Sequence, residues 1–318
     1  YQQWTPPAPA FVLLVGDATQ DFRDNFNTGS VNFVPSQIVQ TSLLGDTPSD
    51  NWFVQVSGND VLPDMFVGRL SAQTAGQVDD LVDKIIRYEQ SPPDGGWNTQ
   101  ALLVADDDDT AFEAISEELA ARLPADFGAA RVYAANFPPG DPTTEIAAQI
   151  NGGALLVNYA GHGSMNKWGY WDGNQQLIFG SADAAALTNA NRLPVVTAGD
   201  CLNGFFTGVQ SVEALAESLH RPTNGGAVAV WASAAVDFPG GHRALLNGFY
   251  DALFNDGLWQ IGAATTAAQV SALAQNPNWS ETVQTFILFG DPATRLAVPP
   301  STFPSANNVY LPLLERSK

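Results

Sequence analysis

Short apolar runs alternate along the chain with stretches in which apolar residues recur at helical spacing. A continuous apolar run of four to eight residues is typical of a strand that is covered on both faces. We predict such strands over residues 11–17, 65–70, 101–106, 131–135, 154–159, 193–198, 226–233 and 285–291.

Between these runs, apolar residues spaced three and four apart predict amphipathic helices. The clearest stripe consists of Val78, Leu81, Val82, Ile85 and Ile86. Strands that alternate with helices predict an α/β fold, a three-layer α/β/α sandwich around a mostly parallel sheet. The other predicted helices cover residues 112–123, 143–150, 181–190, 211–220, 243–256 and 258–275.

One internal boundary interrupts this pattern. The segment SPPDGG, residues 91–96, ends a helix with proline and glycine, after which the alternation of strand and helix restarts. We therefore predict a smaller N-terminal α/β subdomain over residues 1–95 and a larger subdomain over residues 96–298. The remaining residues, 299–318, are rich in proline and serine at their start and are predicted to be a linker or tail.

Composition narrows the range of partners. The 318 residues carry a formal net charge of −20 and 45% hydrophobic residues. A globular protein with this charge repels phosphate backbones, so nucleic acid and anionic membranes are poor partners, while cationic peptides and divalent cations are favoured. No apolar run reaches the roughly 18 residues of a membrane span. A start at Tyr1 without an initiator methionine indicates a processed or truncated piece. The low lysine content and the acidity favour an exported protein.

Two unusual residues follow two of the predicted strands. His162 lies between two glycines in NYAGHGS, three residues after a strand, and Cys201 follows another strand by three residues in TAGDCLNGFF. It is the only cysteine, which excludes an intrachain disulfide. Sites in parallel sheets form at the carboxyl ends of the strands, so neighbouring strands would bring the imidazole and the thiol to one crevice.

This pairing predicts nucleophilic catalysis. A thiolate attacks carbonyl groups, and a histidine beside it removes the thiol proton and returns a proton to the leaving group. Backbone N–H groups of Gly163 and Cys201 are candidates for an oxyanion hole. The alternative is that Cys201 is a small buried apolar residue and His162 an ordinary loop residue.

The blocks NYAGHGS and GDCLNGFF resemble the gingipain family of cysteine peptidases, which have a caspase-like fold. The flanking segments LLVGD, PDMFVGRL, KIIRYE and TFILFGDPATRL agree, so that the resemblance covers roughly residues 10–298. It implies a catalytic dyad of His162 and Cys201, with Gly163 at the oxyanion position. It also implies export by a bacterium, as a secreted or cell-surface endopeptidase, synthesis with a propeptide and possible structural calcium.

The family also places an acidic residue after the strand that matches ALLVAD, where it orients the histidine. The run Asp106 to Asp109 occupies this place, and Asp107 is our choice. The same acids have simpler explanations, either as the solvated start of a helix or as a calcium site.

The best-known members cleave after arginine or lysine, by means of an acid in a longer insert than this chain has. Asp109 or Asp237 is predicted to supply that charge here, and Trp231 or Phe238 a wall of the pocket. Two tryptophans and the two other histidines are predicted to have no part in catalysis. We expect Trp168 and Trp171 to pack within loops, and His220 and His242 to lie at the surface or at helix ends.

The sequence thus predicts a cysteine endopeptidase that acts on polypeptides through an acyl-enzyme thioester, without an organic cofactor. The alternative is a non-catalytic caspase-fold module for binding or assembly in a secreted bacterial protein. A serine hydrolase is disfavoured because the chain has no G-x-S-x-G motif, and a zinc peptidase because it has no H-E-x-x-H motif.

Overall fold

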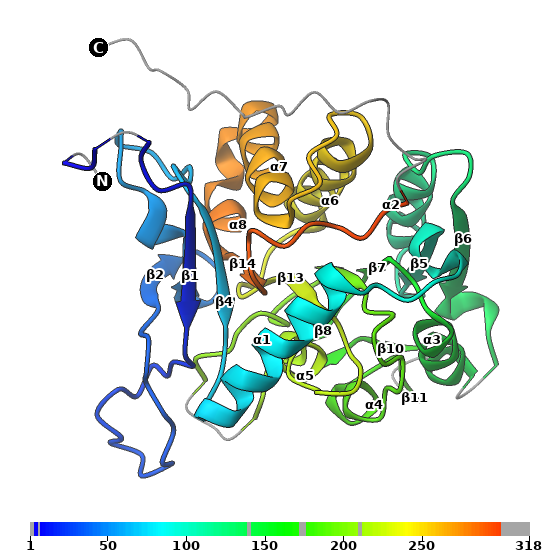
Figure 1. The fold of residues 1–318 in the computed structure, drawn as a ribbon, viewed down its shortest axis with the longest axis horizontal. Coiled ribbons are helices and arrows are strands. Elements are labelled where there is room, and N and C mark those ends of the chain that lie inside the picture. Colours follow the sequence, from blue (N-terminus) through cyan, green and yellow to red (C-terminus); the bar gives the residue numbers. More distant parts are fainter. Residues whose placement is uncertain (1–2, 6, 139–140, 172–175, 209–211, 300–318) are drawn as a thin grey trace.

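An eight-stranded sheet forms the centre of the computed structural model, which describes residues 3–5, 7–138, 141–171, 176–208 and 212–299 (Figure 1). The predicted tail beyond residue 299 lies outside these ranges. In order across the sheet, the strands are β1 (Phe11–Val15), β4 (Phe66–Leu70), β14 (Phe286–Phe289), β13 (Ala229–Ser233), β12 (Val195–Gly199), β7 (Leu156–Ala160), β5 (Gln100–Ala105) and β6 (Gly128–Tyr133).

The sheet is made of two groups of strands that run in opposite directions. Strands β13, β12, β7, β5 and β6 are parallel to one another, and β14 is antiparallel to β13. On its other side β14 is parallel to β4, through the pair Phe289 and Arg69, and β4 is parallel to β1. The strands of the first 95 residues therefore join the same sheet as the rest of the chain.

Helices cover both faces of this sheet. On one face α2 (Thr110–Ala120) and α6 (Pro239–Phe254) contact the central strands, and α7 (Ile261–Gln275) packs on α6 and β4. On the other face α3 (Asp141–Gly152) and α5 (Leu215–His220) contact strands, and α4 (Ser181–Ala185) packs on both helices. This arrangement confirms the predicted α/β/α sandwich. Two further helices are α1 (Ala75–Gln90) and α8 (Ser280–Thr285).

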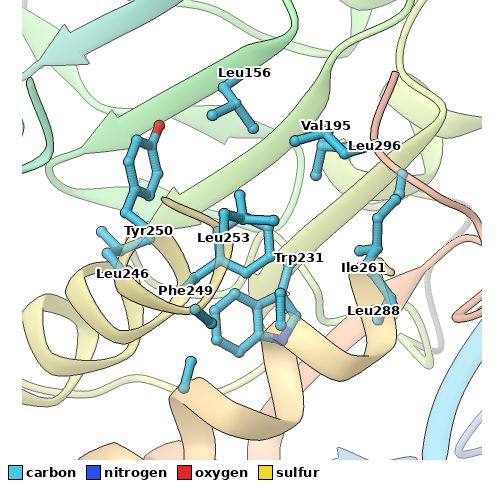
Figure 2. Close-up of a cluster of buried hydrophobic side chains, with 14 of the residues drawn as sticks. Leu156, Val195, Trp231, Leu246, Phe249, Tyr250, Leu253, Ile261, Leu288 and Leu296 are labelled. Carbon is cyan, nitrogen blue, oxygen red and sulfur yellow. The ribbon is translucent and has the colours of Figure 1, made fainter. Parts of the chain in front are cut away.

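Two apolar clusters fill the spaces between the sheet and its helices. Successive strand residues point into opposite clusters, as Val230 and Trp231 do, which explains why the strands are apolar throughout. Figure 2 shows the cluster under α6 and α7, where Trp231 lies among Phe249, Leu253 and Leu288.

Small strand pairs lie outside the main sheet. Strands β2 (Gln37–Thr41) and β3 (Gly45–Ser49) form an antiparallel hairpin. Strands β8 (Gly163–Ser164) and β9 (Lys167–Trp168) form a second pair, and β10 (Tyr170–Trp171) and β11 (Gln176–Leu177) a third. The last two pairs follow β7 directly, at the edge where the predicted site lies.

The two histidines away from the site are buried, contrary to the expectation of surface positions. His220 is the last residue of α5 and His242 lies in the first turn of α6, so both do stand near helix ends. Both are enclosed by protein, and burial lowers the pKa of His242 to about 4. They are therefore neutral core residues. The sequence pattern around them did not show that these helix ends are covered.

A buried lysine on α1 makes the stability of the fold dependent on pH. Lys84 donates hydrogen bonds to the backbone oxygens of His220 and Pro222. Burial, assisted by the nearby charge of Arg87, lowers its pKa to about 7, against roughly 10.4 in an unfolded chain. Between these values the unfolded chain binds more protons than the native one, so stability rises with pH.

We therefore expect the free energy of unfolding to gain up to about 1.4 kcal/mol per pH unit from Lys84 between pH 7 and pH 10. Urea titrations of the wild type and of Lys84→Met at pH 7, 8, 9 and 10 measure this gain. In the variant, the free energy of unfolding is expected to rise less steeply with pH, because the contribution of Lys84 is missing. Identical slopes for the two proteins would show that Lys84 is charged in the folded state at neutral pH.

No helix within the described ranges is both long and apolar enough to cross a bilayer.

Candidate active site

Strands β7 and β12 are neighbours in the sheet, which meets the condition for a shared crevice that the sequence left open. Their parallel register ends with Ala160 opposite Gly199, and His162 and Cys201 each follow two residues later. Adjacent strands lie about 4.8 Å apart, so equivalent positions beyond a shared register stay close. The loop after β7, which carries His162 and is called the histidine loop, and the loop after β12, which carries Cys201 and is called the cysteine loop, therefore start from matched positions at one edge of the sheet.

The glycines on either side of His162 allow its loop to pack closely. A Cβ atom at Gly161 would lie 2.3 Å from the hydroxyl oxygen of Tyr159, and one at Gly163 would lie 2.1 Å from Oδ2 of Asp200. The second would also lie 2.7 Å from the backbone oxygen of Cys201. The histidine loop and the cysteine loop are therefore in direct contact at Gly163.

Three side chains fix the position of His162. Its backbone N–H donates a 3.0 Å hydrogen bond to Oδ2 of Asp106, and its backbone oxygen accepts a 2.7 Å hydrogen bond from the hydroxyl of Tyr159. The exposed imidazole rests against the ring of Phe112 on α2, edge to face, with 5.4 Å between the ring centroids. From the sequence, Asp106 was named only as a member of the acidic run, and Tyr159 and Phe112 were given no part in the site.

Asp106 is the acid that the structure places against the histidine loop. It is buried at the end of β5, and its Oδ1 accepts the N–H of Asp107 at 2.8 Å. Burial raises the pKa of Asp106, and the hydrogen bonds from the N–H groups of His162 and Asp107 act in the opposite direction. The choice of Asp107 as the orienting residue stays a prediction, because the described contact with His162 belongs to Asp106.

Cys201 lies half-buried at the start of its loop. Its thiol donates a long hydrogen bond, 3.8 Å, to the backbone oxygen of Asp237 in the loop after β13. The next residue, Leu202, has a φ angle of +69°, a left-handed conformation that costs free energy for a residue with a side chain. Its N–H donates to the backbone oxygen of Ala235 at 3.1 Å, which helps to hold this conformation.

The sulfur is a thiol in the substrate-free protein. Burial raises the pKa of Cys201, and the carboxyl groups of Asp200 and Asp237 raise it further when they are ionised. The hydrogen bond to the backbone of Asp237 does not compensate for them. The nucleophile therefore needs a base that removes its proton when the substrate arrives.

A buried amide joins the two loops. The side-chain nitrogen of Asn203 donates to the backbone oxygens of Ser164 at 2.7 Å and of Lys167 at 3.1 Å. Ser164 and Lys167 belong to the β8–β9 pair that follows the histidine. Asn203 stands two residues after the cysteine, so one side chain of the GDCLNGFF block ties the cysteine loop to the histidine loop.

The residues predicted to bind substrate have different surroundings. Phe238 is 70% exposed and directly follows Asp237, whose backbone oxygen accepts the hydrogen bond from the thiol of Cys201. The carboxylate of Asp237 accepts hydrogen bonds from the hydroxyl of Thr282 and from the N–H of Phe238. Asp109 is exposed and accepts the N–H of Ala111 at 2.8 Å as the N-cap of α2.

The prediction that Trp231 forms a pocket wall is wrong. The side chain is 1% exposed and packs in the core against the ring of Phe249 (Figure 2). It also contacts the ring of Phe286. A strand that is buried on both faces has no polar positions to show which side chains turn towards a site. The expectation for the two tryptophans after His162 is confirmed, because Trp168 stacks on Tyr159 and both Trp168 and Trp171 are buried.

Calcium binding at the acidic run stays a prediction. Ligand atoms of Asp106, Asp107 and Asp108 lie within 4.8 Å of one another, and calcium takes six to eight oxygen ligands. Both carboxylate oxygens of Asp106 accept hydrogen bonds, from Asp107 and from His162, and a hydrogen-bonded carboxylate can still ligate a cation through a remaining lone pair. We assign no ion to this run and no role in catalysis to one.

The comparison with known proteins identifies relatives of the whole described chain. The model of Peptidase family C25 matches residues 1–297. Gingipain R2 of Porphyromonas gingivalis is 32% identical over 223 residues, which are 68% of this chain and 27% of that protein. Lys-gingipain HG66 of the same organism is 25% identical over 205 residues, 63% of this chain and 10% of that protein. The resemblance to gingipains is confirmed.

Solved structures agree with this relationship. The crystal structure of the Arg-specific cysteine proteinase gingipain R superposes with a TM-score of 0.72 at 25% identity, over 90% of this chain and 64% of that one. The complex of the pro- and mature domains of RgpB from Porphyromonas gingivalis gives a TM-score of 0.73 at 25% identity, over 91% and 66% of the two chains. The chain thus matches about a quarter or less of the length of these curated gingipains.

Proposed function

The chain belongs to peptidase family C25, and we propose that it is a cysteine endopeptidase whose catalytic dyad is Cys201 and His162. The observation that carries the proposal is the shared register of β7 and β12, which starts both loops from matched positions, together with the contact of Gly163 with Cys201. The thiol and the imidazole are the two groups that this chemistry needs.

The reaction proceeds through a thioester. His162 takes the proton of the Cys201 thiol as the sulfur attacks the peptide carbonyl, and the carbonyl oxygen becomes an oxyanion held by the backbone N–H groups of Gly163 and Cys201. The protonated imidazole then gives its proton to the leaving amine. Water, activated by the same imidazole, hydrolyses the thioester and regenerates the thiol. No organic cofactor takes part, and Asp107 remains the proposed partner that orients the imidazole.

We propose cleavage after a basic residue. The net charge of −20 attracts cationic peptides, and relatives that are 32% and 25% identical are gingipains named for arginine or lysine. Near the nucleophile, Asp237 supplies a carboxylate and Phe238 an exposed ring on which a guanidinium group or an alkyl stem can rest. Asp109 is the second candidate for the charge.

The proposal extends to maturation and location. A related mature domain forms a complex with its own prodomain, and we propose a propeptide for this chain as well. The gingipain relatives described above belong to a bacterium, and the low lysine content and high acidity favour a secreted or cell-surface protein of bacteria. Structural calcium remains a proposal without an assigned site.

A second candidate function is a non-catalytic binding or assembly module on the same fold. The raised pKa of Cys201 favours it, because such a thiol is not an activated nucleophile by itself. The two functions differ in the behaviour of the thiol towards a peptide. Only the peptidase acylates Cys201 with a substrate-derived group at neutral pH.

Hydrolysis of a peptide library tests the proposal. Four sets of peptides carry arginine, lysine, leucine or phenylalanine before the scissile bond, and mass spectrometry records the cleavage sites. We expect cleavage after arginine and lysine at least about tenfold faster than after leucine. Peptidase activity with a preference for apolar residues would contradict the specificity. No cleavage of any set, in protein freed of a propeptide, would favour the binding module.

A further inference from the structure

A buried carboxyl group directly precedes the nucleophile and has no place in the mechanism above. Asp200 is 1% exposed. Within the described part of the chain, neither of its carboxyl oxygens has a hydrogen-bond partner from another residue. An unpaired charge in such a place costs several kcal/mol, so the residue needs a physical explanation.

The carboxyl group lies between the two loops of the site. Its Oδ2 is the atom that a Cβ at Gly163 would approach to 2.1 Å, and Gly163 directly follows His162. On the other side, Asp200 continues into Cys201. The side chain therefore fills the space between the turn that carries the imidazole and the backbone that carries the thiol.

Burial favours the uncharged form of the Asp200 carboxyl group. Burial raises its pKa well above the ordinary range, and the carboxylate of Asp106 raises it further. The titratable groups around it come from several elements: Asp106 after β5, Tyr159 in β7, Cys201 beside it, and His242 of α6, which bonds the backbone of Gly199. Within this set no cation faces Asp200, because burial keeps His242 neutral.

We propose that Asp200 is a positioning residue for the peptidase reaction, whose buried carboxyl group sets the separation of the His162 and Cys201 loops. The proposal rests on the proposed peptidase function. The shape of the group matters because Gly163 packs directly on it, and a smaller side chain leaves a void into which the histidine loop can move. Its neutrality matters because a second negative charge beside Asp106 would push the loops apart and oppose ionisation of the thiol.

Two variants separate shape from charge. Asp200→Asn keeps the shape and is uncharged at every pH, whereas Asp200→Ala removes the shape. We expect Asp200→Asn to keep kcat within about threefold of the wild type at pH 7, and we expect its kcat to decline less than that of the wild type as the pH is raised above neutral. We expect Asp200→Ala to lower kcat about 10- to 100-fold with KM within about threefold, as a misplaced catalytic pair does.

Thr207→Val is the matched control. Its hydroxyl is also buried in the cysteine loop and has no hydrogen-bond partner in the described residues. The atoms nearest to a Cβ at Gly163 belong to Asp200 and Cys201 and not to Thr207. We expect this variant to keep the kcat and the pH profile of the wild type. Wild-type kcat in Asp200→Ala, or an equal loss in Asp200→Asn and Asp200→Ala, would overturn the proposal.

Alkylation of the single cysteine tests the same idea without peptide cleavage. Intact-mass measurement follows the reaction of Cys201 with iodoacetamide from pH 6 to pH 11. We expect a lower midpoint pH in Asp200→Asn than in the wild type, because the variant has no acid that becomes charged beside the thiol. An unchanged midpoint would overturn the action of Asp200 on the nucleophile. Inactivity of the wild type towards peptides would instead contradict the proposed function, and the alkylation result would still decide the role of Asp200.

Discussion

Replacing Cys201 by alanine abolishes peptide cleavage and leaves the fold intact. The mechanism has no other thiol to form the thioester, so we expect kcat to fall by about 10⁴-fold or more. Because the thiol is half-buried and makes a single long hydrogen bond, the melting temperature should stay within about 2 °C of the wild type. Hydrolysis of an arginine-containing fluorogenic peptide and a thermal melt measure the two effects.

Cys201→Ser is the matched control for this result. Its hydroxyl has nearly the shape of the thiol and is far less ionised at neutral pH, so cleavage should be almost as low as in the alanine variant. Neither variant should incorporate iodoacetamide, because the chain has no other cysteine. Cleavage at the wild-type rate by Cys201→Ala would exclude the cysteine mechanism.

Replacing Arg69 by methionine lowers the free energy of unfolding by about 3–5 kcal/mol. The guanidinium of Arg69 in β4 is fully buried and binds both carboxylate oxygens of Asp50, at 2.6 and 2.8 Å. It also donates to the backbone oxygens of Gly16 and Val34, and it lies over the ring of Phe206 in the cysteine loop. The variant leaves the charge of Asp50 buried without its partner. Urea unfolding monitored by tryptophan fluorescence measures the loss.

Two further variants test whether burial of the ion pair causes the loss of stability in Arg69→Met. Arg131→Met removes an exposed ion pair with Glu117 of similar geometry, and we expect it to cost less than about 1 kcal/mol. The double variant Arg69→Met with Asp50→Leu should recover part of the loss, because it removes the uncompensated charge as well. If Arg69→Met were as stable as Arg131→Met, burial of the ion pair would not be the reason for its strength.

The main strands were predictable because burial on both faces leaves a continuous apolar run. Strand β3 was missed because its sequence, GDTPS, contains glycine, aspartate and proline, which are rare in strands. Tertiary contacts hold it in place: the hydroxyl of Ser49 donates to the backbone oxygen of Gln284, next to the end of α8. The amide of Asn51 binds the same segment. No local pattern contains such contacts between distant residues.

The site was predictable only in part, for a physical reason. His162 and Cys201 follow two apolar runs at equal spacing, and this spacing is visible in the sequence. Which of several adjacent acids turns inwards is not visible, so Asp106 was passed over in favour of Asp107. Trp231 was assigned to the wrong side of its strand because both sides are apolar. The depth of Asp200 depends on the close approach of Gly163, which is a property of the folded chain.

The position of β14 has a consequence for biosynthesis. It follows every other strand of the sheet in the sequence, yet it lies between β4 and β13. Until residues 286–289 leave the ribosome, the nascent chain carries two partial sheets with open inner edges, which invite pairing with other chains. Translation that pauses before this segment would therefore leave a chain dependent on chaperones. Insertion of β14 between β4 and β13 joins the two partial sheets into the single eight-stranded sheet.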